Sequence, residues 1–244
     1  LAAGVNVFIY DWYWYGGRPF LEDALNNGFL KAPNNERMKF FLMWANHDVD
    51  NLWNNKIGKA KKEKINWSAD VSYDEFTKVL VPRFIAYFKK PNYYKIANKP
   101  VFAIFLMRNF VRGAGGPEKT KAALEFLESE CKKAGFDGLH FMAMNVPSKT
   151  PVPGRENPSL GEIAEYYGFD SMSAYNWGGS RKGGYAAWRD RNIPLWDKFK
   201  KDFGVFFPIV STGWDNNPRF PQEISYVKNS TPADFEYALR KAKE

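Results

Sequence analysis

Residues 7–17 read VFIYDWYWYGG and place one acid and four aromatic rings directly after an apolar run. The run at 5–10 is short and rich in β-branched and aromatic residues, which is typical of a strand buried on both faces in a parallel sheet. In parallel α/β folds the carboxyl ends of the strands open onto the binding face, so Asp11 to Trp14 are expected there. Gly16 and Gly17 break the strand. The stretch therefore predicts the wall of a binding site.

Four other apolar runs are followed by polar and aromatic residues in the same way, at WANHD (44–48), MAMNVP (142–147), AYNW (174–177) and STGWDNNPR (211–219). Sugars present apolar C–H faces and polar rims, so a sugar site needs aromatic platforms beside hydrogen-bonding groups. For any single aromatic side chain, packing at the end of the sheet is an equal alternative. The aromatic candidates are Trp12, Tyr13, Trp14, Trp44, Tyr175, Trp177 and Trp214, and the polar candidates are Asp11, Asn46, His47, Asp48, Asn145, Asn176 and Asp215.

Several of these side chains also allow other chemistry. Asp11 and Asp215 are candidates for the paired carboxylates of a glycosidase. His47 stands beside Asp48, but this spacing matches no metal-ligand pattern, so we expect hydrogen bonds to sugar hydroxyls and no bound metal. His140 lies inside an apolar pattern and is expected in the core. Arg108 could bind an anionic sugar substituent or form a structural ion pair.

An alternation of strand and helix patterns must position these residues. Strands are predicted at about 5–10, 38–44, 100–106, 138–144, 169–174 and 205–211, and helices at about 18–30, 73–88, 117–134, 160–167, 185–202 and 231–243. Such alternation predicts a parallel sheet with right-handed crossovers. A doubly wound open sheet gathers its ligand groups at one switch point, whereas here they follow nearly every strand. A (β/α)8 barrel with a site ringed by its loops fits better.

Composition limits the possible classes of protein. The 244 residues suffice for one domain, 1–244, and include a single cysteine, Cys131, which cannot form a disulfide within the chain. No apolar run is long enough to span a membrane, and the first residues lack the pattern of a signal peptide. The net charge is +8, and Lys56 to Lys64 carry five lysines and one acid. That basic run could attract anionic groups or be a solvated loop.

The stretches DWYWYGG, LMWANHD, YYKIANKPVF, GFDSMSAYNW, STGWDNNPR and TPADFEYALRKAKE resemble, in order and spacing, the glycoside hydrolase family 71/99-like group. This group includes family 99 endo-α-mannosidases and WbsX-type proteins of polysaccharide gene clusters. The resemblance runs over almost the whole chain. It implies a (β/α)8 barrel with a carbohydrate cleft at the carboxyl ends of its strands, no cofactor, and cleavage of an α-linked glycan with retention.

The sequence departs from that group at both ends. The group has a strand before the one that opens this chain, and its reacting acids come from an Asn-Glu-Trp-x-Glu-Gly type motif after an eighth strand, beyond Glu244. The resemblance therefore implies about six βα units here and no hydrolysis by residues 1–244 alone. It assigns Asp11 and Asp215 to substrate hydroxyls or to support of the site.

Three classes of function are compatible with these features. The first is hydrolysis of a polysaccharide or oligosaccharide, such as an α-mannan, which would favour the periplasm or the cell exterior over the cytoplasm. The second is glycosyl transfer, which needs a phosphate-linked donor; the acidic DVD at 48–50 is the one DxD candidate. The third is a non-catalytic binding module. Nucleic-acid binding is not expected, because lysines and aromatics are not interleaved along the chain.

Overall fold

The computed structural model describes residues 4–50, 65–145, 147, 149–216 and 226–244. The basic run at 56–64 lies outside these residues. Among the helices of the described ranges, none is long and apolar enough to cross a membrane.

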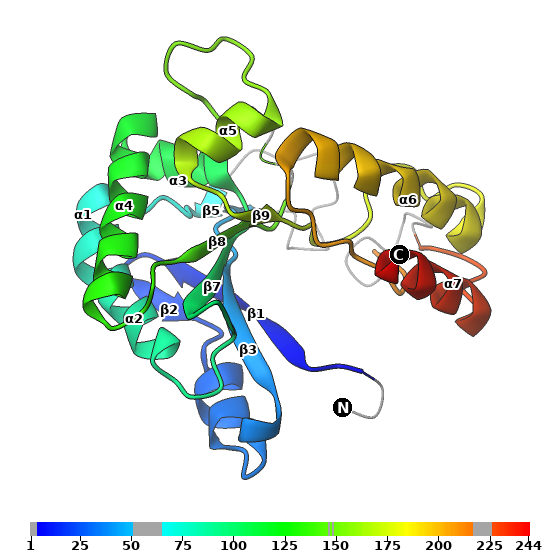
Figure 1. Ribbon diagram of the computed structural model, residues 1–244, viewed down its shortest axis with the longest axis horizontal. Helices are drawn as coiled ribbons and strands as arrows, with labels where there is room; N and C mark the ends of the chain where they lie inside the picture. Colours follow the sequence, from blue (N-terminus) through cyan, green and yellow to red (C-terminus); the bar gives the residue numbers. More distant parts are fainter. Residues whose placement is uncertain (1–3, 51–64, 146, 148, 217–225) are drawn as a thin grey trace.

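A parallel sheet forms the centre of the molecule (Figure 1). Its strands are β1 (Val7–Tyr15), β3 (Lys39–Trp44), β7 (Lys99–Ile104), β8 (His140–Ala143) and β9 (Ser171–Met172), in that spatial order. Each neighbouring pair is parallel, and Trp12 of β1 is level with Trp44 of β3 and Ile104 of β7. Because all five strands point the same way, the segments after them lie at one end of the sheet.

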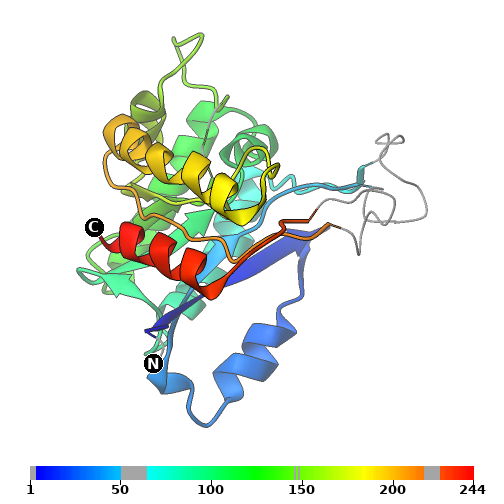
Figure 2. The same cartoon turned by 90° about the vertical axis from the view of Figure 1, so that its right-hand side faces the viewer.

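Helices cover the sheet between these strands. Residues 73–88 form one continuous helical segment, made of α1 (Tyr73–Glu75), a π-helical stretch (Phe76–Leu80) and α2 (Val81–Phe88). Further along the chain lie α4 (Pro117–Lys133), α5 (Leu160–Tyr167), α6 (Gly184–Phe203) and α7 (Pro232–Lys243). The Ser72, Ser159 and Thr231 side chains each accept a hydrogen bond from a backbone amide in the first turn of the helix that follows. Helices α6 and α7 lie side by side (Figure 2).

The prediction of a helix at 18–30 was wrong for its first part and is confirmed only from Ala24 onward. Gly16 and Gly17, with φ of +57° and +77°, make a tight turn, and β2 (Arg18–Phe20) returns antiparallel to the end of β1. Helical structure begins only afterwards, with a π-helical turn (Ala24–Gly28) and a 3₁₀ turn (Phe29–Lys31). The two glycines that break the parallel pattern thus start a hairpin, which extends β1 past Asp11.

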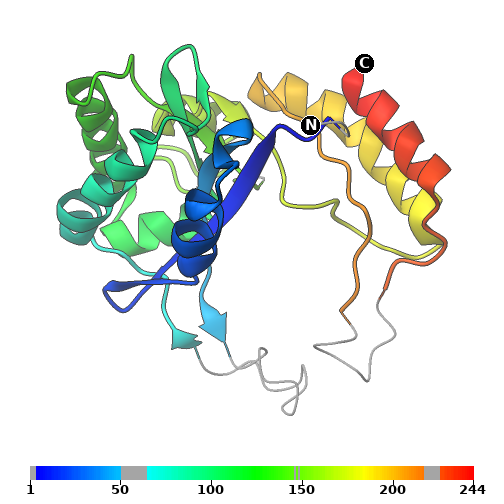
Figure 3. The same ribbon diagram turned by 90° about the horizontal axis from the view of Figure 1, so that it is seen from below.

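The other differences concern short elements. Helix α3 (Met107–Ala114) was not predicted, and it follows β7 directly. The strand predicted at 205–211 is reduced to one parallel bridge, between Met172 and Phe206. Two more short strands, β4 (Val49–Asp50) and β5 (Ile65–Trp67), pair antiparallel, and Figure 3 shows them projecting at the same end of the molecule as the β1–β2 hairpin. A further short strand, β6 (Lys95–Ile96), pairs antiparallel with β7.

Aromatic side chains pack between the sheet and its helices in the core. Phe102 of β7 packs against Phe84 and Phe88 of α2, with ring centroids 4.6 and 6.1 Å apart. His140 lies on the opposite face of the sheet, is 9% exposed, and its Nε2 is 2.8 Å from the Ser171 hydroxyl, which confirms the predicted core position. Burial lowers the pKa of His140, so its neutral form is favoured.

Apolar side chains are exposed at both outer edges of the described sheet. Val5, Phe8 and Ile9, in and just before β1, are 43–49% exposed, and Val205 and Phe207 beside β9 are 52% and 40% exposed. Between residues 7 and 11, β1 pairs with β3 on one side and with no other described strand. Apolar groups on an unpaired edge are characteristic of surfaces that pair with further structure.

Candidate functional site

The alternation of side chains along β1 separates the residues of the DWYW stretch. Trp12 and Trp14 turn toward the helices and are 2% and 5% exposed. The Trp12 indole N–H donates to Glu22 at 2.7 Å, and the Trp14 indole N–H donates to Glu75 at 2.7 Å. Because neighbouring residues of a strand point to opposite faces, Asp11 and Tyr13 are directed to the other side of the sheet.

Trp44 and Asn46 also occupy packing positions after β3. Trp44 is fully buried and contacts the ring of Phe110 in α3 at 5.0 Å. Asn46 is 1% exposed, donates to the carbonyl of Leu106 at 2.9 Å and accepts from the amide of Leu106 at 2.8 Å. Asn46 therefore ties the end of β3 to the end of β7, and it holds the adjacent His47 and Phe105 in register.

Five partly exposed side chains form a cluster on the inner face, at the carboxyl ends of the strands. We call Asp11, Tyr13, His47, Phe105 and Tyr175 the Asp11 cluster. The Tyr175 and Tyr13 hydroxyls are 3.3 and 3.5 Å from the same carboxylate oxygen of Asp11. Edge-to-face ring contacts connect Tyr13 to His47, His47 to Phe105, and Phe105 to Tyr175, with centroids 5.8, 6.0 and 5.6 Å apart.

The electrostatics of this cluster centre on Asp11. Burial raises the pKa of Asp11, although the bonds from Tyr175 and Tyr13 and the nearby His47 act in the opposite direction. Burial and the neighbouring carboxylate raise the pKa of Tyr13 to about 12, so this phenol keeps its proton at neutral pH. The cluster thus combines a polar acceptor with donor hydroxyls and exposed ring surface, which are the groups that a sugar ring requires.

Asp48 is held in a separate ion-pair network. Burial opposes its charge, but hydrogen bonds from Arg112 at 2.7 Å and from the Ala69 amide at 2.9 Å lower the pKa of Asp48. Arg112 also contacts Asp70 at 2.6 Å. These contacts join the segments on either side of β4 and β5 to α3, so Asp48, the first carboxylate of the DVD stretch, has a structural partner.

Trp177 and Trp214 belong to a second aromatic cluster, built around α6. Trp177 is 2% exposed, packs against Trp188 and donates to the carbonyl of Ile209 at 2.8 Å. Trp214 is half-buried at the edge of this cluster, and the adjacent Asp215 is exposed. Asn145 and Asn176 line a pocket of about 260 Å³ between α6 and the segment after β9.

The structure therefore distributes the predicted residues over several environments. Trp44 and Asn46 are buried in the main core and Trp177 in the second one, so these three predicted site residues do not face a common cleft with Asp11. The physical reason is that side chains alternate between the two faces of a strand, so about half of the predicted residues after each strand turn toward the helices. Phe105 was missed because it ends a run, residues 101–105, in which every side chain is apolar, so no alternation marks the face to which it points.

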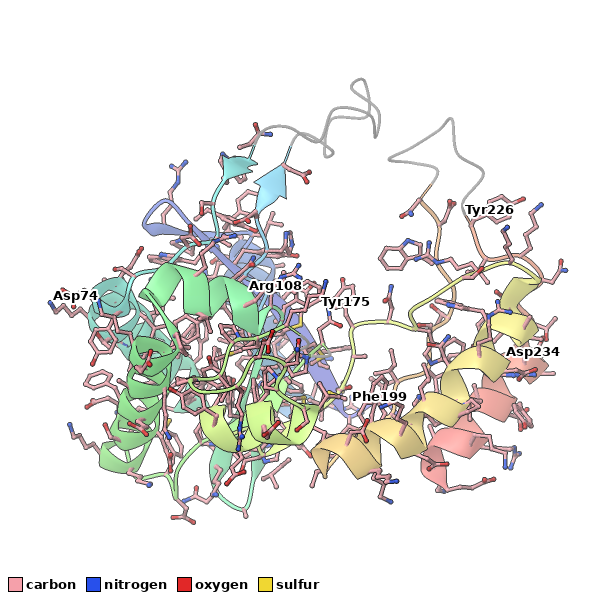
Figure 4. The ribbon with its side chains drawn as sticks, turned by 90° about the horizontal axis from the view of Figure 1, so that it is seen from above. Asp74, Arg108, Tyr175, Phe199, Tyr226 and Asp234 are labelled. Carbon is pink, nitrogen blue, oxygen red and sulfur yellow. The ribbon has the colours of Figure 1, made fainter. Side chains whose placement is uncertain are left out.

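The carboxylates do not form an evident catalytic pair. Asp11 contacts Tyr13 and Tyr175, whereas Asp215 lies beside a different pocket, which Trp214 and Tyr226 also line. In the described part of the chain, no group of three His, Cys, Asp or Glu side chains is arranged to hold a metal ion. Arg108 lies on the first turn of α3, and its side chain is exposed. Figure 4 labels both Arg108 and Tyr175.

The comparisons with known proteins agree with a glycan-related protein of α/β fold. Residues 1–244 match the model of a family described as "Glycosyltransferase WbsX", and the chain belongs to this family. The chain is 22% identical over 234 residues to the protein WxcX of Xanthomonas campestris pv. campestris strain B100, and 21% identical to WxcX of a second strain. Each match covers 88% of this chain and 29% of WxcX, so the chain spans less than a third of those relatives.

Solved structures give the same fold. A protein described as "glycoside hydrolase-like" superposes with a TM-score of 0.60 at 14% identity, covering 99% of this chain and 68% of its own. The GH99 endo-α-mannosidase from Bacteroides thetaiotaomicron is also similar, with a TM-score of 0.48 at 14% identity, covering 96% of this chain and 58% of its own. The recognised likeness is thus confirmed at the level of family by the WbsX match and at the level of fold by the glycoside hydrolase-like protein.

Proposed function

We propose that this chain is the glycan-binding part of a carbohydrate-active enzyme, with the Asp11 cluster at the centre of its cleft. The observation that carries the proposal is that side chains from β1 and from the segments after β3, β7 and β9 form one connected cluster, in which two tyrosine hydroxyls meet at Asp11. Groups from several strand ends, all on one face, are the usual arrangement of a site in parallel α/β folds.

The reaction we propose is hydrolysis of glycosidic bonds in a polysaccharide, and an α-mannan-like substrate suits the resemblance to family 99. Asp11, Tyr13 and Tyr175 would bind sugar hydroxyls, and Phe105 would offer an apolar face. Asp11 has one carboxylate and no second acid among its described contacts, whereas a glycosidase needs two carboxyl groups about 5–10 Å apart. Because the glutamate motif of the family 99 enzymes has no counterpart in residues 1–244, we propose that Asp11 binds substrate and that these residues alone do not hydrolyse it.

The architecture that we propose is part of a (β/α)8 barrel. The exposed apolar side chains of Val5, Phe8 and Ile9 on one edge, and of Val205 and Phe207 on the other, support further pairing at both edges. In such a barrel the Asp11 cluster would stand at the carboxyl end, where barrel enzymes have their active sites.

Binding of α-mannan oligosaccharides and mixed bacterial polysaccharide fragments to residues 1–244 tests the proposal. We expect Tyr175→Ala to weaken binding by about tenfold, because it removes both a ring face and a hydroxyl donor. Tyr237→Ala is the matched control, since Tyr237 is similarly exposed on α7 at 46% against 48% for Tyr175. Equal affinities of the two variants would contradict the proposed cleft. Hydrolysis by residues 1–244 that Asp11→Asn abolishes would move the catalytic acid into this chain.

Glycosyl transfer is the alternative, and the description of the family favours it. A transferase needs a donor activated by phosphate, whereas a hydrolase needs only water and the glycan. Incubating the whole protein with an acceptor glycan, with and without nucleotide-sugar or lipid-linked donors, separates the two. A product longer than the acceptor would support transfer, and shortened products without any donor would support hydrolysis.

A further inference from the structure

A glycine-rich basic loop connects Trp177 to helix α6 and has no role in the Asp11 cluster. Residues 178–184 read GGSRKGG, and we call them the glycine-rich loop. A pocket of about 440 Å³ lies against it. The described residues that line this pocket are Gly179, Arg181, Lys182, Gly183, Gly184, Tyr226 and Lys228. Three of these side chains are cationic, and none is acidic.

We propose that this pocket binds an anionic group, either a phosphate of an activated sugar donor or the carboxylate of an acidic sugar. The two ligands share the same recognition chemistry, namely negatively charged oxygens that accept hydrogen bonds from cationic side chains and backbone amides. Figure 4 shows Tyr226, which lines the pocket, near one end of the long helix that precedes α7. The proposal concerns binding alone and does not depend on the reaction proposed above.

The environment of Arg181 is the main support for an anion site in this pocket. Its guanidinium carbon is 5.4 Å from the ring centroid of Trp214 and 5.8 Å from that of Trp188. Its Nε is buried and has no hydrogen-bond partner among the described residues. Burial lowers the pKa of Arg181, and no described carboxylate offsets this effect. The indoles thus hold a guanidinium that lines the pocket and whose Nε has no acceptor among the described residues.

A neighbouring arginine shows that this situation is specific to Arg181. Arg189 lies in the second turn of α6, and it donates to Asp190 and to Asp234, each at 2.8 Å. These bonds raise the pKa of Arg189, the opposite direction from that of Arg181. The same region of the fold therefore neutralises one arginine with two acids and leaves the other with aromatic contacts only.

Hydrogen bonds from α6 hold the loop in one conformation. Gly178 donates to the Asn192 side chain at 3.1 Å, and its carbonyl accepts from the Trp188 indole at 2.8 Å. Arg191 donates to the carbonyls of Ser180 and Lys182 at 2.8 and 2.6 Å. A site whose loop is already ordered loses little conformational entropy when its ligand binds.

Glycine is required at the end of the loop. Gly183 and Gly184 have φ of +88° and +81°, a region that other residues rarely adopt. A Cβ atom on Gly183 would lie 2.9 Å from the Ala187 Cβ, and one on Gly184 would lie 3.1 Å from the Lys228 carbonyl oxygen. Within the described part of the chain, the amides of these two glycines have no hydrogen-bond acceptor. They add hydrogen-bond donors to the cationic side chains.

Calorimetric titration at low ionic strength tests the proposal with two probes, pyrophosphate and methyl β-glucuronide. We expect the unmodified protein to bind at least one of them, with an affinity that falls as salt is added. We expect Arg181→Gln to weaken that binding by about tenfold or more. Arg37→Gln, a matched change at an exposed arginine far from the pocket, should alter it less than about twofold.

A second variant keeps the test decisive, because Arg181→Gln also removes two aromatic contacts. Lys228→Gln leaves those contacts in place, and its thermal midpoint should equal that of Arg37→Gln while its anion affinity falls. Preference for pyrophosphate would identify a phosphate site, and preference for the glucuronide an acidic-sugar site. Failure of the unmodified protein to bind either probe at millimolar concentration, or unchanged binding in both variants, would overturn the proposal.

Discussion

Glu22 is predicted to stabilise the strand that carries the Asp11 cluster. One carboxylate oxygen accepts from the Trp12 indole at 2.7 Å and from Arg83 Nε at 2.9 Å. The other accepts from Arg83 Nη2 at 2.6 Å and from Asn26 at 3.1 Å. The Glu22 side chain is 10% exposed, so water can replace few of these bonds. Glu22 thereby fixes Trp12 toward the helices, which directs Asp11 to the other face.

The perturbation is Glu22→Gln, which preserves shape and removes charge. In either orientation the new NH₂ group must face two donors, so two hydrogen bonds are lost, at least one of them to Arg83. Every one of these bonds ends on a charged carboxylate, and such a bond contributes about 1.5–3 kcal/mol. Because the Arg83 side chain is 37% exposed, we take the lower end of this range and discount the Arg83 bond for solvent screening. The expected loss is about 2–3 kcal/mol of unfolding free energy.

Urea unfolding at neutral pH measures this loss, and thermal unfolding provides a second measure. For a chain of this size, about 2–3 kcal/mol corresponds to a fall of about 4–12 °C in the thermal midpoint. Asp74→Asn is the control, because Asp74 and Lys78 form an ion pair whose side chains are 69% and 71% exposed. That variant should stay within about 0.5 kcal/mol of the unmodified protein. Equal stabilities of Glu22→Gln and Asp74→Asn would refute the reasoning.

Three further predictions concern titratable groups. Contacts with Arg112 lower the pKa of Asp48 in the folded state, so the stability that this carboxylate contributes is present above its unfolded pKa of about 3.9 and is lost as pH falls through the folded value. Arg112→Gln should therefore flatten the acid limb of a stability-versus-pH curve, and an unchanged limb would contradict the assignment. Burial raises the pKa of Asp11, so the charged form of this carboxylate lowers the free energy of unfolding at neutral pH. Asp11→Asn should therefore raise the thermal midpoint while weakening glycan binding. A lower thermal midpoint would count against this account. Burial and nearby acids raise the pKa of the Cys131 thiol to about 12, so iodoacetamide should label it at pH 8 only after unfolding, and rapid labelling of the native protein would show the thiol to be accessible.

Much of the fold could be predicted from the sequence, because the signals are local. Apolar runs at 38–44, 100–106 and 138–144 are strands whose burial on both faces makes them hydrophobic throughout. Helix α7 begins at Pro232, directly after its N-cap residue Thr231. The capping hydrogen bond and the proline at the first helical position both depend on neighbouring residues in the sequence. The carboxyl ends of the parallel strands were correctly expected to lie at one end of the sheet, because strand direction follows from the alternation of strands and helices.

The composition of the candidate site depended on the tertiary structure. Asp11 and Trp12 are adjacent in sequence, yet one contacts Tyr175 and the other contacts Glu22 on the helix side of the sheet. Which face becomes the inner one is set by the packing of α2 and α3 against β1, β3 and β7, and no local pattern encodes it. Likewise, only the packing of Trp188 and Trp214 around Arg181 distinguishes this arginine from Arg189, since a contact between residues distant in sequence leaves no periodic signal in either segment.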